Sequence, residues 1–279
     1  MTTAIRVHGL RKSYGSYEAL RGIDLEIRSG EVFGLLGPNG AGKTTTVEIL
    51  EGYRRPDSGT VEVLGENPER ASRSWRERIG VVLQSSSLYP NLTVRESLAL
   101  FGGYYRRPRD IGEVIELVGL AEKARARVRT LSGGQQRRLD LGLALIGDPE
   151  LIFLDEPTTG FDPSARRTAW ETIRGLRGLG KTVLLTTHYL DEAAQLADRV
   201  AVLREGRIIT LGSPAELTAT REDTEIRYLG PDGRQVALHT KEPTRMVADL
   251  YTRYGELRSL EVRRATLEEI YLSLTEDEG

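Results

Sequence analysis

Short apolar runs alternate with amphipathic stretches along roughly the first 220 residues of the chain. Five runs stand out, at residues 32–36, 79–83, 151–154, 183–187 and 199–203, and several are apolar at nearly every position. Strands buried on both faces of a parallel sheet have this pattern, whereas half-exposed strands alternate apolar and polar positions. The intervening stretches match amphipathic helices. The pattern therefore predicts an α/β fold with helices covering a mainly parallel sheet.

Two regions depart from this alternation. Residues 86–148 are mostly helical in pattern, with Leu139, Leu143 and Ile146 spaced to share one helix face, which predicts a helical subdomain inserted into the sheet order. After about residue 220, the turn residues 230–233 separate runs 225–229 and 235–239, as in a β-hairpin.

A helix over 243–254, a strand over 256–263 and a last helix over 266–274 are expected to follow this hairpin. Thr266 is the expected N-cap of the last helix, with Glu269 three residues on, and the acidic tail 276–278 is expected to be a solvated end. We therefore predict two domains. The first is a large α/β domain at 1–220 with a helical subdomain at about 86–148, and the second is a small α+β domain at 221–279.

Composition narrows the function classes. The chain has 279 residues, no cysteine, and 39 basic against 41 acidic side chains, for a formal net charge of -2. The lack of cysteine excludes disulfides and thiolate metal sites and agrees with a reducing compartment. No run of 18 apolar residues and no secretion-signal pattern is present, so we expect a cytoplasmic location. The balanced charge gives no reason to expect a nucleic-acid partner.

A glycine-rich turn follows the apolar run 32–36 and precedes a helical stretch. It comprises Gly37, Pro38, Asn39, Gly40, Ala41, Gly42, Lys43 and Thr44, followed by Thr45. In a P-loop, the glycines let backbone N–H groups face phosphates, the lysine meets the β and γ oxygens, and the hydroxyl binds Mg²⁺. The alternative is a glycine-rich turn at a helix start, which the preceding strand makes less favourable.

Two carboxylates, Asp155 and Glu156, end the apolar run 151–154. Ligands of open α/β sheets bind beside the carboxyl ends of the strands. Asp155 is therefore a candidate for holding Mg²⁺, and Glu156 for the general base or the residue that orients the attacking water. Without the P-loop, a solvated loop would be an equally good interpretation.

The segment Leu131-Ser132-Gly133-Gly134-Gln135 separates the P-loop classes. Ser132 is an expected N-cap, so its helix would direct the Gly133 and Gly134 amides at an anion. With this segment the chain resembles the ATP-binding-cassette (ABC) family over about residues 4–218. In that family the motif contacts the nucleotide held by the opposing subunit. The resemblance implies a P-loop ABC core with an antiparallel edge sheet, and a head-to-tail dimer that binds two ATP molecules.

Four further positions resemble family residues. Tyr14 resembles the aromatic that stacks on adenine, with Tyr17 as a rival; Gln84 resembles the glutamine that reaches Mg²⁺ and the attacking water. His188 resembles the switch histidine that bonds the γ phosphate. Asp162 resembles the acid that crosses the dimer interface, although Phe161 replaces the usual leucine before it. The resemblance thus implies Thr44, Gln84 and Asp155 as Mg²⁺ ligands, and Glu156, His188, Gln84 and Lys43 as catalytic groups.

The resemblance also implies partners and a transport role. ATPases of this family power a separate transmembrane permease subunit from the inner face of the membrane, through a groove near residues 84–91, where Leu88 and Tyr89 are candidate contacts. Residues 264–271 resemble the C-terminal segment of bacterial drug and antibiotic exporter ATPases of the daunorubicin-resistance type. An exporter subunit, working as a homodimer, is therefore expected. The alternative is a cassette protein that acts on ribosomes or DNA.

Overall fold

The computed structural model describes residues 2–83, 88–219, 224–230, 232–264 and 271. Its contacts divide the chain into two compact units, Met1–Leu211 and Gly212–Gly279. The sequence places the domain boundary at residue 220 instead, and that division stays a prediction. Among the described helices, none has the length and apolar character needed to cross a bilayer.

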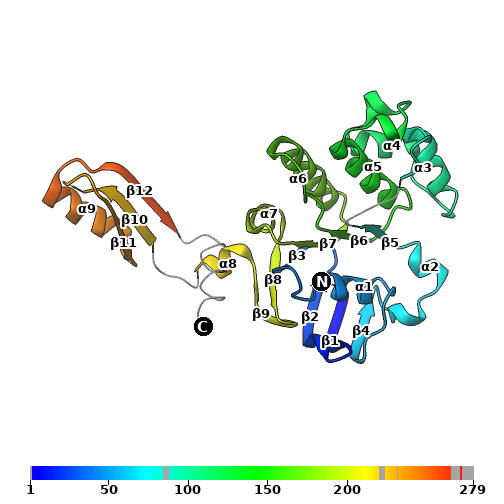
Figure 1. Ribbon diagram of the computed structural model, residues 1–279, viewed down its shortest axis with the longest axis horizontal. Helices are drawn as coiled ribbons and strands as arrows, with labels where there is room; N and C mark the ends of the chain where they lie inside the picture. The colour runs from blue at the N-terminus through cyan, green and yellow to red at the C-terminus, as the bar shows by residue number, and fades with distance from the viewer. Residues whose placement is uncertain (1, 84–87, 220–223, 231, 265–270, 272–279) are drawn as a thin grey trace. The chain divides into compact units, whose positions relative to one another are not determined.

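A six-stranded sheet forms the centre of the first unit, in the order β5-β6-β7-β3-β8-β9 (Figure 1). Its strands are β5 (Ile79–Val82), β6 (Leu151–Asp155), β7 (Thr182–Thr187), β3 (Val32–Leu36), β8 (Arg199–Arg204) and β9 (Arg207–Gly212). Each strand pairs in parallel with its neighbour from β5 through β6, β7 and β3 to β8. Every residue of β3, β6 and β7 is buried, which explains their continuous apolar runs and confirms the predicted sheet.

An antiparallel sheet, in the order β2-β1-β4, lies on one side of the central sheet. It contains β1 (Thr3–Tyr14), β2 (Tyr17–Arg28) and β4 (Ser58–Val63). Apolar residues of this sheet, of the helix α1 (Lys43–Leu50) and of one face of the central sheet share a single core, which includes Leu20, Val47 and Phe153. The antiparallel sheet expected from the family resemblance is thereby confirmed.

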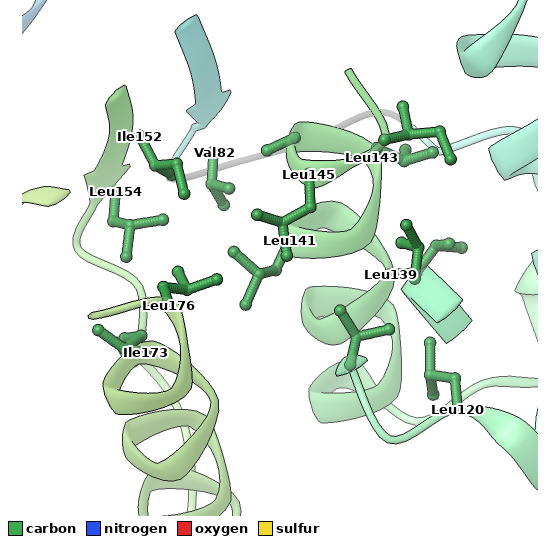
Figure 2. Packing of buried hydrophobic residues seen from close by; sticks show 14 of the residues in the cluster. Val82, Leu120, Leu139, Leu141, Leu143, Leu145, Ile152, Leu154, Ile173 and Leu176 are labelled. Atoms are coloured by element: carbon green, nitrogen blue, oxygen red, sulfur yellow. The ribbon is translucent and has the colours of Figure 1, made fainter. Parts of the chain in front are cut away.

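A helical lobe connects β5 to β6, as the crossover between two parallel strands requires. It contains α3 (Val94–Gly102), α4 (Ile111–Leu117) and α5 (Gly133–Leu145), after the short α2 (Arg73–Arg76) that precedes β5. Leu139, Leu143 and Ile146 are buried, as their spacing predicts. Figure 2 shows side chains of α5 and α6 (Pro163–Gly178) directed toward those of β5 and β6. The lobe, α6 and the sheet therefore share a second core, to which α7 (Leu190–Leu196) adds Leu196.

The second unit contains α8 (Pro214–Ala219) and a three-stranded antiparallel sheet in the order β11-β10-β12. The predicted hairpin is confirmed, because β10 (Thr224–Leu229) pairs with β11 (Gln235–Thr240) in the register Leu229↔Gln235. Helix α9 (Pro243–Tyr254) has the predicted bounds, and β12 (Arg258–Arg264) starts two residues later than expected. Apart from residue 271, the expected last helix and the acidic tail lie outside the described residues.

Candidate functional site

The glycine-rich turn joins β3 to α1, at the carboxyl end of the central sheet. Gly42 has φ +108, and a Cβ there would lie 2.8 Å from the Ala19 carbonyl oxygen, so a side chain is excluded on both grounds. A Cβ at Gly37 would collide with the Leu203 carbonyl oxygen. The loop is therefore packed against β2 and β8 at both ends. Its backbone can curl only because these positions lack side chains.

Lys43 is only 5% exposed and holds the loop from inside. Its Nζ donates to the carbonyl oxygens of Gly37 at 2.8 Å and Pro38 at 3.3 Å. Nζ also lies 3.5 Å from Glu156 Oε1. Burial lowers the pKa of Lys43, and the charge of Glu156 opposes that effect. The Lys43 side chain is thus placed where the loop curls, beside an acidic partner whose charge favours the ammonium form.

Glu156 has a left-handed backbone conformation, with φ +46, directly after β6. Its N–H donates to the hydroxyl of Thr186 at 3.0 Å and to the Thr186 carbonyl at 3.2 Å. Its carboxylate accepts from Thr159 Oγ1 at 3.2 Å and lies 3.3 Å from Nδ1 of His188. Lys43, Glu156 and His188, which are far apart in sequence, therefore meet around one carboxylate.

Asp155 and Thr44 offer the oxygen ligands that Mg²⁺ prefers. Asp155 is buried, and its Oδ1 accepts from Thr186 Oγ1 at 2.5 Å, which fixes the orientation of the carboxylate. Thr44 is exposed in the first turn of α1. Among the described residues, no group of three or more histidine, cysteine and acidic side chains is arranged so that it could hold a metal ion. Gln84, the third expected ligand, lies outside the described residues.

Tyr14 and Tyr17 both lie beside the loop. The Tyr14 hydroxyl is 3.5 Å from Thr45 Oγ1, and the guanidinium of Arg54 is 5.1 Å from the centre of its ring. Tyr17 instead donates its hydroxyl to the Gly40 carbonyl oxygen at 2.9 Å. The hydroxyl contact of Tyr14 with the loop is therefore longer than that of Tyr17, which leaves the Tyr14 ring freer to stack on a base. The stacking role of Tyr14 stays a prediction.

The segment that begins with Ser132 forms the start of α5. Ser132 Oγ accepts from the Gln135 N–H at 3.3 Å, and Gln135 Oε1 accepts from the Ser132 N–H at 3.0 Å, in a capping box. Ser132 and Gly133 are exposed. Across the described part of the chain, no hydrogen bond or ion pair joins residues 132–135 to residues 37–45. This helix start is thus exposed to solvent, and none of those bonds ties it to the chain's own P-loop.

Asp162 is the N-cap of α6, accepting from the backbone N–H groups of Ser164 and Ala165 at 2.9 Å each. The two helix starts lie close together, because a Cβ built on Gly134 would be 3.6 Å from that of Ala165. Ser132 and Asp162 therefore share one exposed edge of the chain. Asp162 therefore also caps a helix within its own chain, a role that the family resemblance did not imply.

Three residues of the site were missed by sequence reasoning. Thr186 contacts both Asp155 and Glu156, and its only signal is a pair of threonines at the end of a buried run. Glu192 is buried and accepts from Thr158 Oγ1 at 2.7 Å and Trp170 Nε1 at 3.1 Å. Arg137 donates to backbone carbonyls on both sides of Glu156. No sequence pattern distinguishes Glu192 or Arg137 from ordinary helix residues.

This geometry defines a class of protein. A parallel sheet, a P-loop with a buried lysine and a strand-end pair of carboxylates beside a histidine form the phosphate site of a P-loop ATPase.

Comparisons with known proteins give the family. A family model described as ABC transporter matches residues 20–159. The daunorubicin resistance ATP-binding protein DrrA3 of Streptomyces coeruleorubidus is 42% identical, covering 99% of this chain and 97% of that protein. A Nod factor export ATP-binding protein I of Paraburkholderia xenovorans is 46% identical, covering 82% and 77%. A dimeric ATP-binding cassette in a post-hydrolysis state, bound to ADP and Pi, matches with a TM-score of 0.67 at 27% identity, covering 75% of this chain and 98% of that one.

The chain belongs to the ABC transporter family, and it is an ATP-binding subunit that hydrolyses ATP. The resemblance and the α/β ABC fold expected from the sequence are confirmed. The alternative of a cassette acting on ribosomes or DNA is not favoured, because the curated relatives are ATP-binding proteins of resistance and export systems.

Glu51, at the end of α1, gives this region a pH-dependent stability. Its Oε1 is buried and has no hydrogen-bond partner among the described residues. Burial, and then the charges of Asp155 and Glu48, raise the pKa of Glu51 from 4.5 to about 8. The Glu51 carboxyl group therefore binds its proton more tightly in the folded chain than in the unfolded chain. The resulting stabilisation is complete below pH 4.5 and is lost as the pH rises through about 8.

We predict that Glu51→Gln removes this pH dependence. Between pH about 5.5 and about 8.5 the melting temperature of the wild-type chain should fall more steeply than that of the variant, since the amide stays neutral throughout. Thermal unfolding by circular dichroism, without nucleotide and with a chelator, measures the difference. The exposed Glu122→Gln is the control and should follow the wild type. Parallel curves for Glu51→Gln and the wild type would contradict the prediction.

Proposed function

We propose that this chain is the ATP-hydrolysing subunit of an exporter of drug-like or lipid-like compounds, working as a dimer with a separate transmembrane subunit. One observation carries the proposal. Lys43, Glu156 and His188 meet at one phosphate site, whereas the start of α5 at Ser132 is exposed, and no hydrogen bond or ion pair of the described residues joins it to the chain's own P-loop. A second chain is the partner that would bring such a helix start to the γ phosphate.

At the phosphate site, each side chain would act on a different part of ATP. Backbone N–H groups of the loop and Lys43 would bind the β and γ phosphates, with Tyr14 stacked on adenine. Mg²⁺ held by Thr44, Asp155 and Gln84 would neutralise charge on the phosphates. Glu156 would orient the attacking water and accept its proton. The 3.3 Å contact between His188 and Glu156 supports a role for the imidazole in holding that carboxylate, and the imidazole would also bond the γ phosphate.

The dimer would be head-to-tail. The amides of Gly133 and Gly134 at the start of α5 form a positive helix end that suits a γ phosphate. Asp162 lies on the same edge and would cross to the partner chain. Because each ATP would then lie between the P-loop of one chain and the Ser132 end of the other, binding closes the dimer and hydrolysis lets it open. A homodimer suffices, since one chain carries both halves of the site.

The transport role rests on the curated relatives, which are named for daunorubicin resistance and Nod factor export. The permease would contact the helical lobe near Leu88 and Tyr89, at the inner face of the membrane. Leu88 packs partly against the core of the lobe, and Tyr89 is 54% exposed, so Tyr89 is the better candidate for the contact. The domain at 221–279 would belong to the same exporter subunit. No nucleic-acid partner is proposed.

Replacing Glu156 by Gln tests the hydrolytic assignment. We expect turnover to fall by about 100-fold or more, because the amide cannot accept a proton, while MgATP binding persists. The trapped ATP should shift the variant from monomer to dimer in size-exclusion chromatography with light scattering. The exposed Glu171→Gln is the control and should behave like the wild type. Undiminished turnover would remove Glu156 from the mechanism.

The composite site makes a sharper prediction about pairs of defective chains. Lys43→Met should remove phosphate binding, and Ser132→Arg should block the contact with the partner's ATP, so each variant alone is expected to be inactive. An equal mixture should regain up to about a quarter of wild-type turnover, because half of the dimers are mixed and each has one intact site of two. A colorimetric phosphate assay measures the recovery. A mixture as inactive as its components would exclude sites shared between two chains.

Export is tested in cells that produce the chain together with the membrane protein that co-purifies with it. We expect these cells to accumulate less daunorubicin than matched cells producing the Lys43→Met chain, because efflux requires hydrolysis. Fluorescence of the retained compound gives the measurement. Equal accumulation in both strains would show that daunorubicin is not exported by this subunit.

A further inference from the structure

Arg137, on the second turn of α5, contacts three backbone carbonyls at or just beyond the carboxyl ends of two strands of the central sheet. Its Nε donates to the Pro157 carbonyl at 3.3 Å and its Nη2 to the Asp155 carbonyl at 3.0 Å. Its Nη1 donates to the carbonyl of Leu83. All three nitrogens of one guanidinium therefore bind main-chain oxygens outside the helical lobe. The contacts lie at the carboxyl ends of two neighbouring strands, β5 and β6.

These carbonyls bracket the residues that the proposed mechanism needs. Asp155 and Pro157 are the two neighbours of Glu156 in the chain, so the guanidinium spans the peptide segment that carries the carboxylate. Leu83 directly precedes Gln84 in the sequence. Because Glu156 has φ +46, its direction depends on how the backbone on both sides is held. Thr186 binds this segment from β7, and Arg137 binds it from α5.

The charge and burial of Arg137 suit this task. The side chain is only 13% exposed, and Asp140, one turn later on the same helix, lies 4.0 Å from Nη1. Burial lowers the pKa of Arg137, and the charges of Asp140 and Asp155 oppose that effect. A guanidinium presents its donors in a fixed planar fork, which a lysine ammonium cannot reproduce. The three carbonyls are therefore matched by arginine specifically.

The position of Arg137 along α5 connects the two composite sites of the proposed dimer. Ser132, the N-cap, and Arg137 belong to one continuous helix, so a displacement of α5 would shift both. The outer end of α5 is the part that would meet the partner's nucleotide, and the Arg137 side chain contacts the turn that aims Glu156 at the chain's own nucleotide.

We propose that Arg137 is a positioning residue that holds Glu156 in its hydrolytic orientation from the helix that begins at Ser132, an inference that rests on the proposed roles of Glu156 and Ser132. Hydrolysis of the ATP held by one chain then depends on where α5 of that chain lies. Arg137 contacts backbone and acts through Glu156, so it is expected to affect the rate of the chemical step rather than the affinity for MgATP.

A double-mutant cycle tests this action. Arg137→Met should lower single-turnover hydrolysis, measured with protein in excess over MgATP, by on the order of 10- to 100-fold with nearly unchanged MgATP affinity. In the Glu156→Gln background the same substitution should lower the residual rate by less than about twofold, because the group that Arg137 positions is already disabled. Arg137→Lys, which keeps the charge but loses the fork, should give an intermediate loss with the same dependence on Glu156.

Arg138→Met is the matched control. Arg138 is the next residue on α5 and donates to the Gly119 carbonyl at 2.9 Å inside the helical lobe, so its loss should leave the hydrolytic rate per bound ATP unchanged. Melting temperatures are recorded for every variant, and if Arg137→Met does not fold, the cycle is completed with Arg137→Lys.

The outcomes separate this inference from the proposed function. If Glu156→Gln hydrolyses ATP like the wild type, the assignment of Glu156 fails and the proposed function with it. If Glu156→Gln is impaired but the Arg137 loss is equally large in both backgrounds, Arg137 acts independently of Glu156 and the inference alone is overturned. A wild-type rate for Arg137→Met, or a loss confined to MgATP affinity, overturns it as well.

Discussion

The backbone turn at Glu156 is the constraint on which the rest of the site depends. A left-handed conformation at a residue other than glycine costs about 1–3 kcal/mol, so it persists only where surrounding contacts hold it. Thr186 accepts from the Glu156 N–H, and Arg137 donates to the carbonyl of Asp155 just before it. Hydrogen bonds from a charged donor contribute about 1.5–3 kcal/mol each, which is enough to offset the strain. The carboxylate thereby points toward Lys43 instead of into solvent.

Electrostatics and packing act together at this turn. Lys43 is buried in a loop that is closed by glycines, where its ammonium donates to carbonyl oxygens and lies 3.5 Å from the Glu156 carboxylate. The Glu156 side chain is itself only 11% exposed. Each group makes the charge of the other tolerable, as buried ionic groups require. An incoming triphosphate would compete for Lys43 and free the carboxylate to orient water, so binding would prepare the site for hydrolysis.

The sequence predicted the elements that carry the site better than the contacts that hold it. The runs at 32–36 and 151–154 gave their strands correctly, because residues buried on both faces leave a continuous apolar signal. The convergence of Lys43 with Glu156 followed from the rule that parallel strands end at one edge. Arg137 could not be found, because a helix residue that binds distant carbonyls has no sequence spacing to reveal it.

Capping contacts within the chain stabilise the two exposed helix starts, although half of each proposed composite site would lie on a second chain. Ser132 closes a capping box with Gln135, and Asp162 caps α6, so the caps bind the N–H groups of Gln135, Ser164 and Ala165 and leave those of Gly133 and Gly134 to a ligand. A ligand anion would bind these two amides in place of water, and this exchange of hydrogen bonds keeps its net gain small. A small net gain suits a reversible closure, because a contact that is removed in every cycle cannot be one on which the fold depends.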